Sequence, residues 1–101
     1  MNKSSTDNKS LSQNAYRRLT ITNSRGLHAR AAAKFASTAG NFEADIQVTR
    51  NDQTVSGLSI MGLMMLAATP GCDIDLSATG PDAIDAINAL SELVDDKFQE
   101  D

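Results

Sequence analysis

The 101-residue chain is poor in aromatic side chains: it has no tryptophan, one tyrosine and three phenylalanines. Its core must therefore be built from aliphatic side chains, alanine and methionine. The single cysteine, Cys72, cannot form an internal disulfide, and we interpret it as a small buried apolar side chain of a strand. The chain is long enough for one domain and too short for two.

Positive charge is also scarce, because 9 Lys and Arg residues stand against 13 Asp and Glu residues. Nucleic-acid binding requires a basic face, usually with stacking aromatic side chains, so no nucleic-acid partner is expected. The longest nearly apolar run, from Ile60 to Ala68, is far shorter than the ~20 residues that span a bilayer. The N-terminus also lacks the apolar segment of a secretory signal. We therefore expect a cytoplasmic protein without membrane insertion.

Residues 1–16 form a polar segment dominated by Ser, Asn, Lys and Asp. Such a segment cannot bury enough apolar surface to offset the entropy lost on ordering. We predict a disordered tail over residues 1–16 and a single domain over residues 17–101.

From Arg17 onward, the apolar periodicity switches between that of a strand and that of a helix. Alternation predicts four strands, and helical spacing predicts three helices, the last beginning near Pro81 with Asp82 in its first turn. Each strand has one apolar face, as in antiparallel sheets covered on one side. The order β-α-β-β-α-β-α therefore predicts an α+β open-faced sandwich, a four-stranded antiparallel sheet with three helices on one face.

His28, the only histidine, lies where a glycine-containing loop meets a predicted helix. The unpaired amides and positive dipole end of a helix favour a bound phosphate, and Arg30 can pair with its oxygens. A neutral imidazole is a nucleophile that can accept a phosphoryl group and pass it on. Taken alone, a histidine at this position is more often a helix cap or a packed loop residue.

The string Gly26-Leu27-His28-Ala29-Arg30 resembles the active-site signature of HPr, the histidine-containing phosphocarrier of the bacterial phosphotransferase system. A second motif, from Val55 to Met64, extends the resemblance to residues 17–97. The resemblance implies that the phosphoenolpyruvate-dependent enzyme I phosphorylates His28 on Nδ1 and that IIA-type proteins accept the group. It also implies a monomeric carrier that is not itself an enzyme and needs no cofactor.

The same resemblance implies that Arg30 neutralises the phosphate beside the helix amides of Ala29 and Ala31. The family commonly has proline directly after this arginine, where the chain has Ala31. Alanine suits a helix and restores a backbone N–H that can face the phosphate. The form of the two motifs is similar to the nitrogen-related regulatory branch rather than to the sugar-permease branch.

Ser59 precedes a short apolar helix and is a candidate N-cap worth about 1 kcal/mol. The family resemblance adds regulatory phosphorylation of Ser59 by an ATP-dependent HPr kinase/phosphorylase. A short helix can bury only one stripe, so the remaining apolar side chains predict an exposed surface for partners. Core filling is the competing interpretation of this helix. The expected docking residues are Leu58, Met61, Gly62 and Met65.

Three other functions agree less well with the sequence. A regulatory adaptor, controlled only through Ser59, would need no histidine, and His28 argues against it. A metal site is not expected, because Cys72 and His28 lie in separate elements and the chain has no Cys-x-x-Cys. A hydrolase triad cannot be assembled around one histidine without a nucleophile and an orienting partner.

Overall fold

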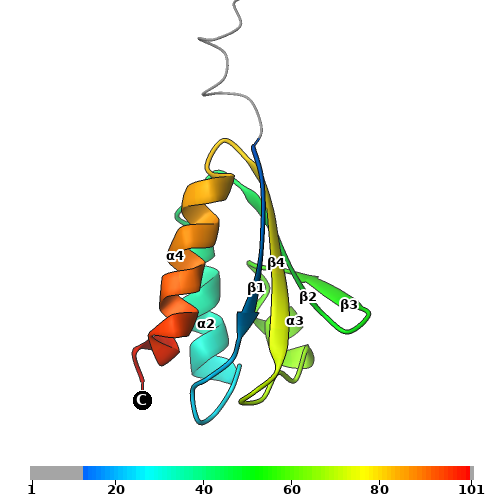
Figure 1. Cartoon of the computed structure of the whole chain (residues 1–101), viewed down its shortest axis with the longest axis vertical. Helices are drawn as coiled ribbons and strands as arrows, with labels where there is room; N and C mark the ends of the chain where they lie inside the picture. The colour runs from blue at the N-terminus through cyan, green and yellow to red at the C-terminus, as the bar shows by residue number, and fades with distance from the viewer. Residues whose placement is uncertain (1–12, 101) are drawn as a thin grey trace, which may run out of the picture.

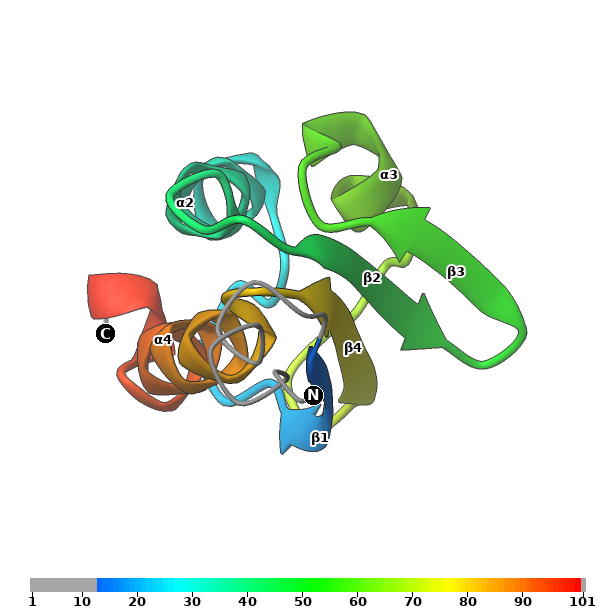
Figure 2. The same cartoon turned by 90° about the horizontal axis from the view of Figure 1, so that it is seen from above.

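The computed structural model describes residues 13–100, so residues 1–12 of the predicted tail lie outside the described residues. All four strands are antiparallel and form one sheet in the order β1-β4-β2-β3. The helices lie together on one face of this sheet (Figures 1 and 2). The predicted fold class is therefore confirmed. The elements are β1 (Gln13–Thr20), α2 (Ala29–Ala39), β2 (Asp45–Arg50), β3 (Gln53–Ser56), α3 (Ile60–Met65), β4 (Asp73–Gly80), α4 (Ala83–Asp95) and a terminal turn, η1 (Lys97–Gln99).

The core lies between the helices and the inner face of the sheet. Strand alternation places Leu19 opposite Ile74 and Val48 opposite Leu76, and all four side chains are buried. On each strand, the residues that alternate with these buried side chains point to the other face of the sheet, which is polar. Two-residue periodicity in the sequence thus determines which face of each strand is covered. The predicted inner stripe of the last helix is also buried: Ala83, Ile87, Leu90 and Val94.

The first strand begins earlier than predicted. β1 starts at Gln13, so residues 13–16, which are part of the predicted disordered tail, belong to the sheet. Ala15 pairs with Ala78 and packs against the core, whereas Tyr16 is exposed and donates a hydrogen bond to Asp75 Oδ1 at 2.9 Å. One small apolar side chain among polar neighbours gives too weak an alternation to be read as a strand, and backbone pairing with β4 orders it.

The last helix begins later than predicted. α4 starts at Ala83, and Asp82 occupies the N-cap position rather than the first turn. The Asp82 carboxylate accepts a hydrogen bond from the Glu43 backbone N–H at 2.8 Å instead of capping the helix. Within residues 13–100, no helix combines the length and apolarity needed to cross a bilayer.

Cys72 is half-buried rather than fully buried as expected. Its sulfur lies 3.4 Å from Thr69 Oγ1 and 3.2 Å from Arg50 Nη2. Hydrogen bonds from Thr69, followed by that from Arg50, lower the pKa of the thiol. Cys72 is therefore a polar contact at the rim of the core, although part of its surface packs against the core.

Candidate phosphoryl-transfer site

The loop before His28 is fixed by contacts with the segment that follows α3. The Leu27 backbone N–H donates to the Ala68 carbonyl at 2.9 Å, and Asn23 Nδ2 donates to the Gly26 carbonyl at 2.8 Å. Gly26 has a φ of 66°, and a Cβ there would clash with the Ala68 carbonyl oxygen. Glycine thus permits both the left-handed turn and the close approach. The loop consequently delivers His28 to the beginning of α2.

His28 is the N-cap of α2, with an extended backbone conformation. Its Nδ1 accepts a hydrogen bond from the Arg30 backbone N–H at 3.3 Å. Nδ1 therefore carries a lone pair, and in the neutral ring the proton lies on Nε2. Nε2 lies 2.9 Å from Glu100 Oε1, to which it donates. The histidine side chain remains 22% exposed, so a partner can reach it.

Glu100 also contacts His28, although no sequence pattern predicts it at the site. It is separated from His28 by 72 positions, and its side chain is only 12% exposed. The hydrogen bond from His28 lowers the pKa of the Glu100 carboxyl, with further contributions from the charges of His28, Lys34 and Arg30. The carboxylate is therefore ionised at neutral pH and acts as an acceptor.

Basic side chains surround this end of α2. Arg30 is exposed at the first turn, and Lys34 follows one turn later. They share an open polar hollow of about 390 Å³ with Arg25 and Glu100. His28 does not itself line this hollow, but Arg30 belongs to the first turn, whose amides favour a bound anion, so this end of α2 has the chemistry to stabilise a phosphoryl group. Of the other predicted phosphate-binding residues, Ala29 is exposed at the first turn and the Ala31 side chain is buried.

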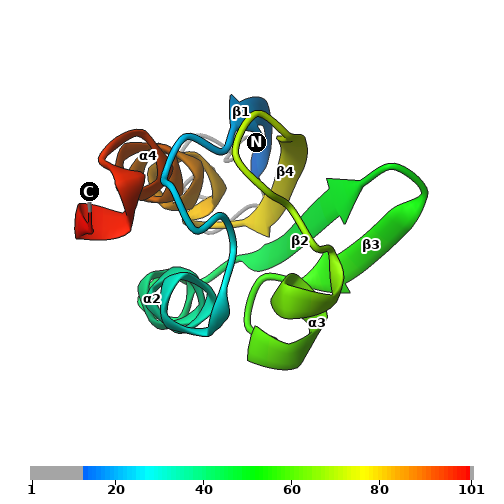
Figure 3. The ribbon, with the colours of Figure 1, turned by 90° about the horizontal axis from the view of Figure 1, so that it is seen from below.

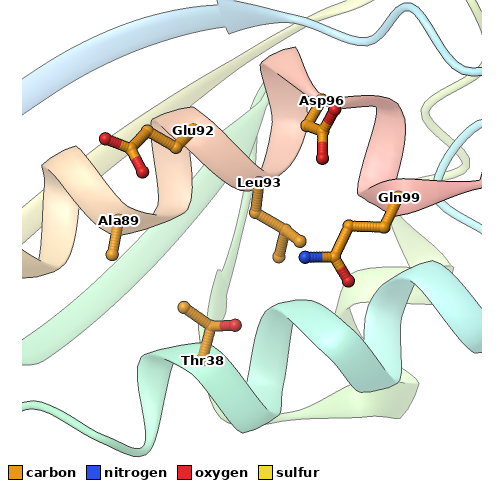
Figure 4. Close-up of a pocket in the computed structure, with 6 residues that line it drawn as sticks. All are labelled: Thr38, Ala89, Glu92, Leu93, Asp96 and Gln99. Carbon is orange, nitrogen blue, oxygen red and sulfur yellow. The ribbon is translucent and has the colours of Figure 1, made fainter.

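A second open hollow, of about 330 Å³, lies between α2 and α4 (Figure 4). It is lined by neither His28 nor Ser59 and is therefore separate from both predicted sites. The residues that line this hollow are Thr38, Ala89, Glu92, Leu93, Asp96 and Gln99.

Among residues 13–100, no group of three or more His, Cys, Asp and Glu side chains could hold a metal ion.

Ser59 is the N-cap of α3, as predicted. Its Oγ accepts a hydrogen bond from the Gly62 backbone N–H at 3.0 Å. A Cβ on Gly62 would lie 3.0 Å from both Val55 Cβ and Ser59 Oγ. Gly62 is an expected docking residue. Its lack of a side chain also has a structural role, because it lets α3 lie close to β3.

The three remaining expected docking residues are exposed: Leu58, Met61 (71%) and Met65 (65%). Leu63 is the buried side of α3, so the helix fills the core with one stripe only. α3 packs beside α2, as two views from opposite ends of the molecule show (Figures 2 and 3). The exposed apolar surface of Leu58, Met61 and Met65 thus lies on α3 and the turn before it, and α3 neighbours the helix that His28 caps.

Comparison with known proteins agrees with this geometry. The family model described as "PTS HPr component phosphorylation site" matches residues 15–96. A phosphocarrier protein HPr of Neisseria meningitidis is 50% identical over 80 residues, which are 79% of this chain and 90% of that protein. A phosphocarrier protein NPr of Shewanella violacea is 44% identical over 84 residues, covering 83% of this chain and 92% of its own.

Solved structures give the same result. The crystal structure of HPr-C-His from Thermoanaerobacter tengcongensis is 41% identical, covers 86% of this chain and 98% of its own, and superposes with a TM-score of 0.83. Sequence, fold and the element order thus agree over most of the described residues. The chain belongs to the HPr family, the phosphocarrier proteins of the phosphotransferase system.

Proposed function

We propose that the protein accepts a phosphoryl group from enzyme I on His28 Nδ1 and donates it to IIA-type proteins. The observation that supports this most directly is the different hydrogen-bond role of the two ring nitrogens, Nδ1 as acceptor and Nε2 as donor. Nδ1 faces the first-turn amide of Arg30 with its lone pair, while Nε2–H is engaged by Glu100 on the other side. The nucleophilic nitrogen is therefore the one that lies at the positive end of α2.

In the transfer step, the Nδ1 lone pair forms a bond to phosphorus as the bond from phosphorus to the donor atom breaks. The electron pair of that broken bond stays on the donor. The product carries close to two negative charges, which the amides of Ala29, Arg30 and Ala31 and the Arg30 guanidinium stabilise. Donation to an acceptor is the reverse step, in which the P–Nδ1 electron pair returns to His28.

Ala31 bears on this balance because proline is common at its position in the family. An alanine keeps the backbone N–H that proline lacks, and this N–H belongs to the first turn beside the phosphoryl group. We expect the phosphorylated form of this chain to be stabilised by one more amide than a proline-containing relative has.

We also propose that an HPr kinase/phosphorylase modifies Ser59. A phosphate on Oγ keeps acceptor oxygens close to the Gly62 N–H and adds close to two negative charges at the start of α3. This charge would lie beside the exposed Leu58, Met61 and Met65, which we propose as the docking surface. We expect a monomer whose acceptors belong to the nitrogen-related branch.

The proposed function is tested by incubating the purified chain with enzyme I and radioactive phosphoenolpyruvate. We expect acid-labile label in the wild-type chain and none in His28→Ala, whose melting temperature should stay close to that of the wild type. Label that survives in His28→Ala would contradict the proposal. Absence of label, with acid-stable incorporation from ATP at Ser59, would favour the regulatory adaptor instead.

A further inference from the structure

Glu100 contacts His28 from the side opposite to the helix amides. Its Oε1 lies 2.9 Å from Nε2, while Nδ1 faces Arg30 N at 3.3 Å. We propose that Glu100 is a positioning residue that holds the His28 proton on Nε2 and thereby presents the Nδ1 lone pair to the phosphoryl donor. This inference rests on the proposed function and adds to it a residue that is 72 positions away in the sequence.

The two contacts of the ring select the same tautomer. A neutral imidazole can carry its proton on either nitrogen, and the partner of each nitrogen determines which form is favoured. Arg30 N–H can only donate, so it requires a lone pair on Nδ1. The Glu100 carboxylate, whose pKa is lowered by His28, can only accept, so it requires a proton on Nε2. Of these two partners, Glu100 is the one that keeps the proton on Nε2 of His28.

The backbone that carries Glu100 has an unusual conformation. Lys97, Phe98 and Gln99 have φ values of 54°, 56° and 62°, three consecutive left-handed residues without a glycine. Strain of this kind persists only where surrounding contacts hold it, and it is concentrated at functional sites. Here Phe98 is fully buried, and Lys34 Nζ donates to its carbonyl oxygen at 2.8 Å. The segment is thus anchored on α2 immediately before Glu100.

The carboxylate itself is not held by a wider hydrogen-bond network. Its second oxygen, Oε2, is buried and has no hydrogen-bond partner among the described residues. An unpaired buried carboxylate oxygen is unfavourable, and a native protein retains such a group where it has a role. The one side-chain hydrogen bond the structure gives Glu100 is to His28 Nε2, which points to the histidine as the reason for its position.

The charge of Glu100 also suits the transfer step. No proton leaves His28 when the P–Nδ1 bond forms, so the phosphorylated ring is cationic with its proton on Nε2. The Glu100 carboxylate balances this positive charge, and it lies across the ring from the phosphoryl group. Because Nδ1 and Nε2 are on opposite sides of the imidazole, this compensation places no negative charge against the phosphoryl oxygens.

We expect the contact between Glu100 and His28 to weaken as the pH falls. The groups that face Glu100 are His28, Arg30 and Lys34, with Arg25 on the same hollow. Since its pKa is lowered in the folded chain, Glu100 is ionised throughout the neutral range. Its contribution is therefore complete above the ordinary glutamate pKa and is lost as the pH falls through the lowered value.

The test compares three variants. Glu100→Ala removes the acceptor and the charge, whereas Glu100→Gln keeps an acceptor oxygen and removes only the charge. Glu92→Gln is the matched control, because it removes the same charge from an exposed position of α4 that does not line the hollow of Arg25, Arg30, Lys34 and Glu100. Melting temperatures establish that each variant is folded before the histidine is examined.

The first readout is the ¹⁵N NMR spectrum of His28 in the unphosphorylated proteins above pH 8. We expect the Nε2–H tautomer to predominate in wild type, Glu92→Gln and Glu100→Gln, and a mixture in Glu100→Ala. The second readout is the rate of labelling by enzyme I, which should fall about tenfold in Glu100→Ala. Glu100→Gln should restore part of that loss, and Glu92→Gln should match the wild type.

An unchanged tautomer in Glu100→Ala, or a labelling rate equal to that of Glu92→Gln, would overturn the role of Glu100. Failure of the wild-type chain to accept label would overturn the proposed function instead. The two failures are distinguishable because the tautomer is measured without any phosphoryl donor.

Discussion

The beginnings of α2 and α3 use the same backbone device in two different ways. Each helix has an N-cap side chain that accepts a hydrogen bond from a first-turn amide: His28 Nδ1 from Arg30, and Ser59 Oγ from Gly62. Both helix ends therefore present unpaired amides and the positive end of a dipole. By backbone geometry alone, either end could stabilise a phosphate.

The side chains around the two ends make the difference. At the start of α2, His28 Nδ1 faces the Arg30 amide and Nε2 is bonded to the Glu100 carboxylate, while Arg25, Arg30 and Lys34 line a hollow together with that carboxylate. α3 has no acidic residue in its first turn, no basic residue in its last, and exposed methionines along its surface. Cations and a nucleophile suit a phosphoryl group that arrives and leaves, whereas an apolar helix suits a protein partner that a phosphate would repel. The N-cap therefore determines where a phosphate can be stabilised, and the surrounding side chains determine what that phosphate does.

Removal of the cation at the start of α2 should have the largest effect on this comparison. We expect Arg30→Ala to slow labelling by enzyme I by about 10²-fold, since it removes a charged donor from the developing phosphoryl charge. The side chain is exposed, so the melting temperature should change little. Arg18→Ala, which removes a guanidinium bonded to Asp75 on the sheet, is the control. Equal rates for the two variants would contradict the role of Arg30.

A charge placed at the start of α3 should have the next largest effect. We expect Ser59→Asp to lower the rate of labelling by enzyme I about tenfold, through repulsion of an acidic or phosphorylated partner. Ser59→Asn is the matched control, because it caps the helix as well as Asp does and has no charge. If the two variants transfer at the same rate, the charge has no influence and the regulatory interpretation of Ser59 fails.

Trimming the apolar surface of α3 should have the smallest effect. The double variant Met61→Ala, Met65→Ala should raise the KM for transfer from enzyme I by a few-fold without lowering kcat, because exposed contact residues contribute about 1 kcal/mol or less each. Ile84→Ala removes a comparably exposed apolar side chain from α4 and should leave KM unchanged. A KM that changes equally in both would show that α3 is not the docking surface.

The fold follows from the sequence wherever periodicity is strong. The alternation at Ile46 and Val48 and the helical stripe that includes Ile87 and Leu90 correctly predicted strands, helices and their buried faces. The prediction failed at residues 13–16, where order comes from pairing with β4, a partner distant in the sequence. Local pattern carries no information about such pairing.

The candidate site shows the same limit. His28 and Ser59 were correctly placed at helix starts because caps are local features with characteristic residues. Glu100 was missed because it reaches His28 through a left-handed turn of non-glycine residues, which no sequence rule predicts. The one available signal was Phe98, an apolar residue after the last helix, whose burial brings the C-terminal segment onto α2.

We propose that Nδ1 of His28 is the atom that accepts the phosphoryl group. This proposal is tested most directly by NMR of the ¹⁵N-labelled chain after incubation with enzyme I and phosphoenolpyruvate. We predict a one-bond coupling between phosphorus and the Nδ1 nitrogen of His28, with Nε2 still protonated. A coupling to Nε2 would contradict the geometry described for the ring, and a phosphoserine signal at Ser59 in place of a phosphohistidine would contradict the account as a whole.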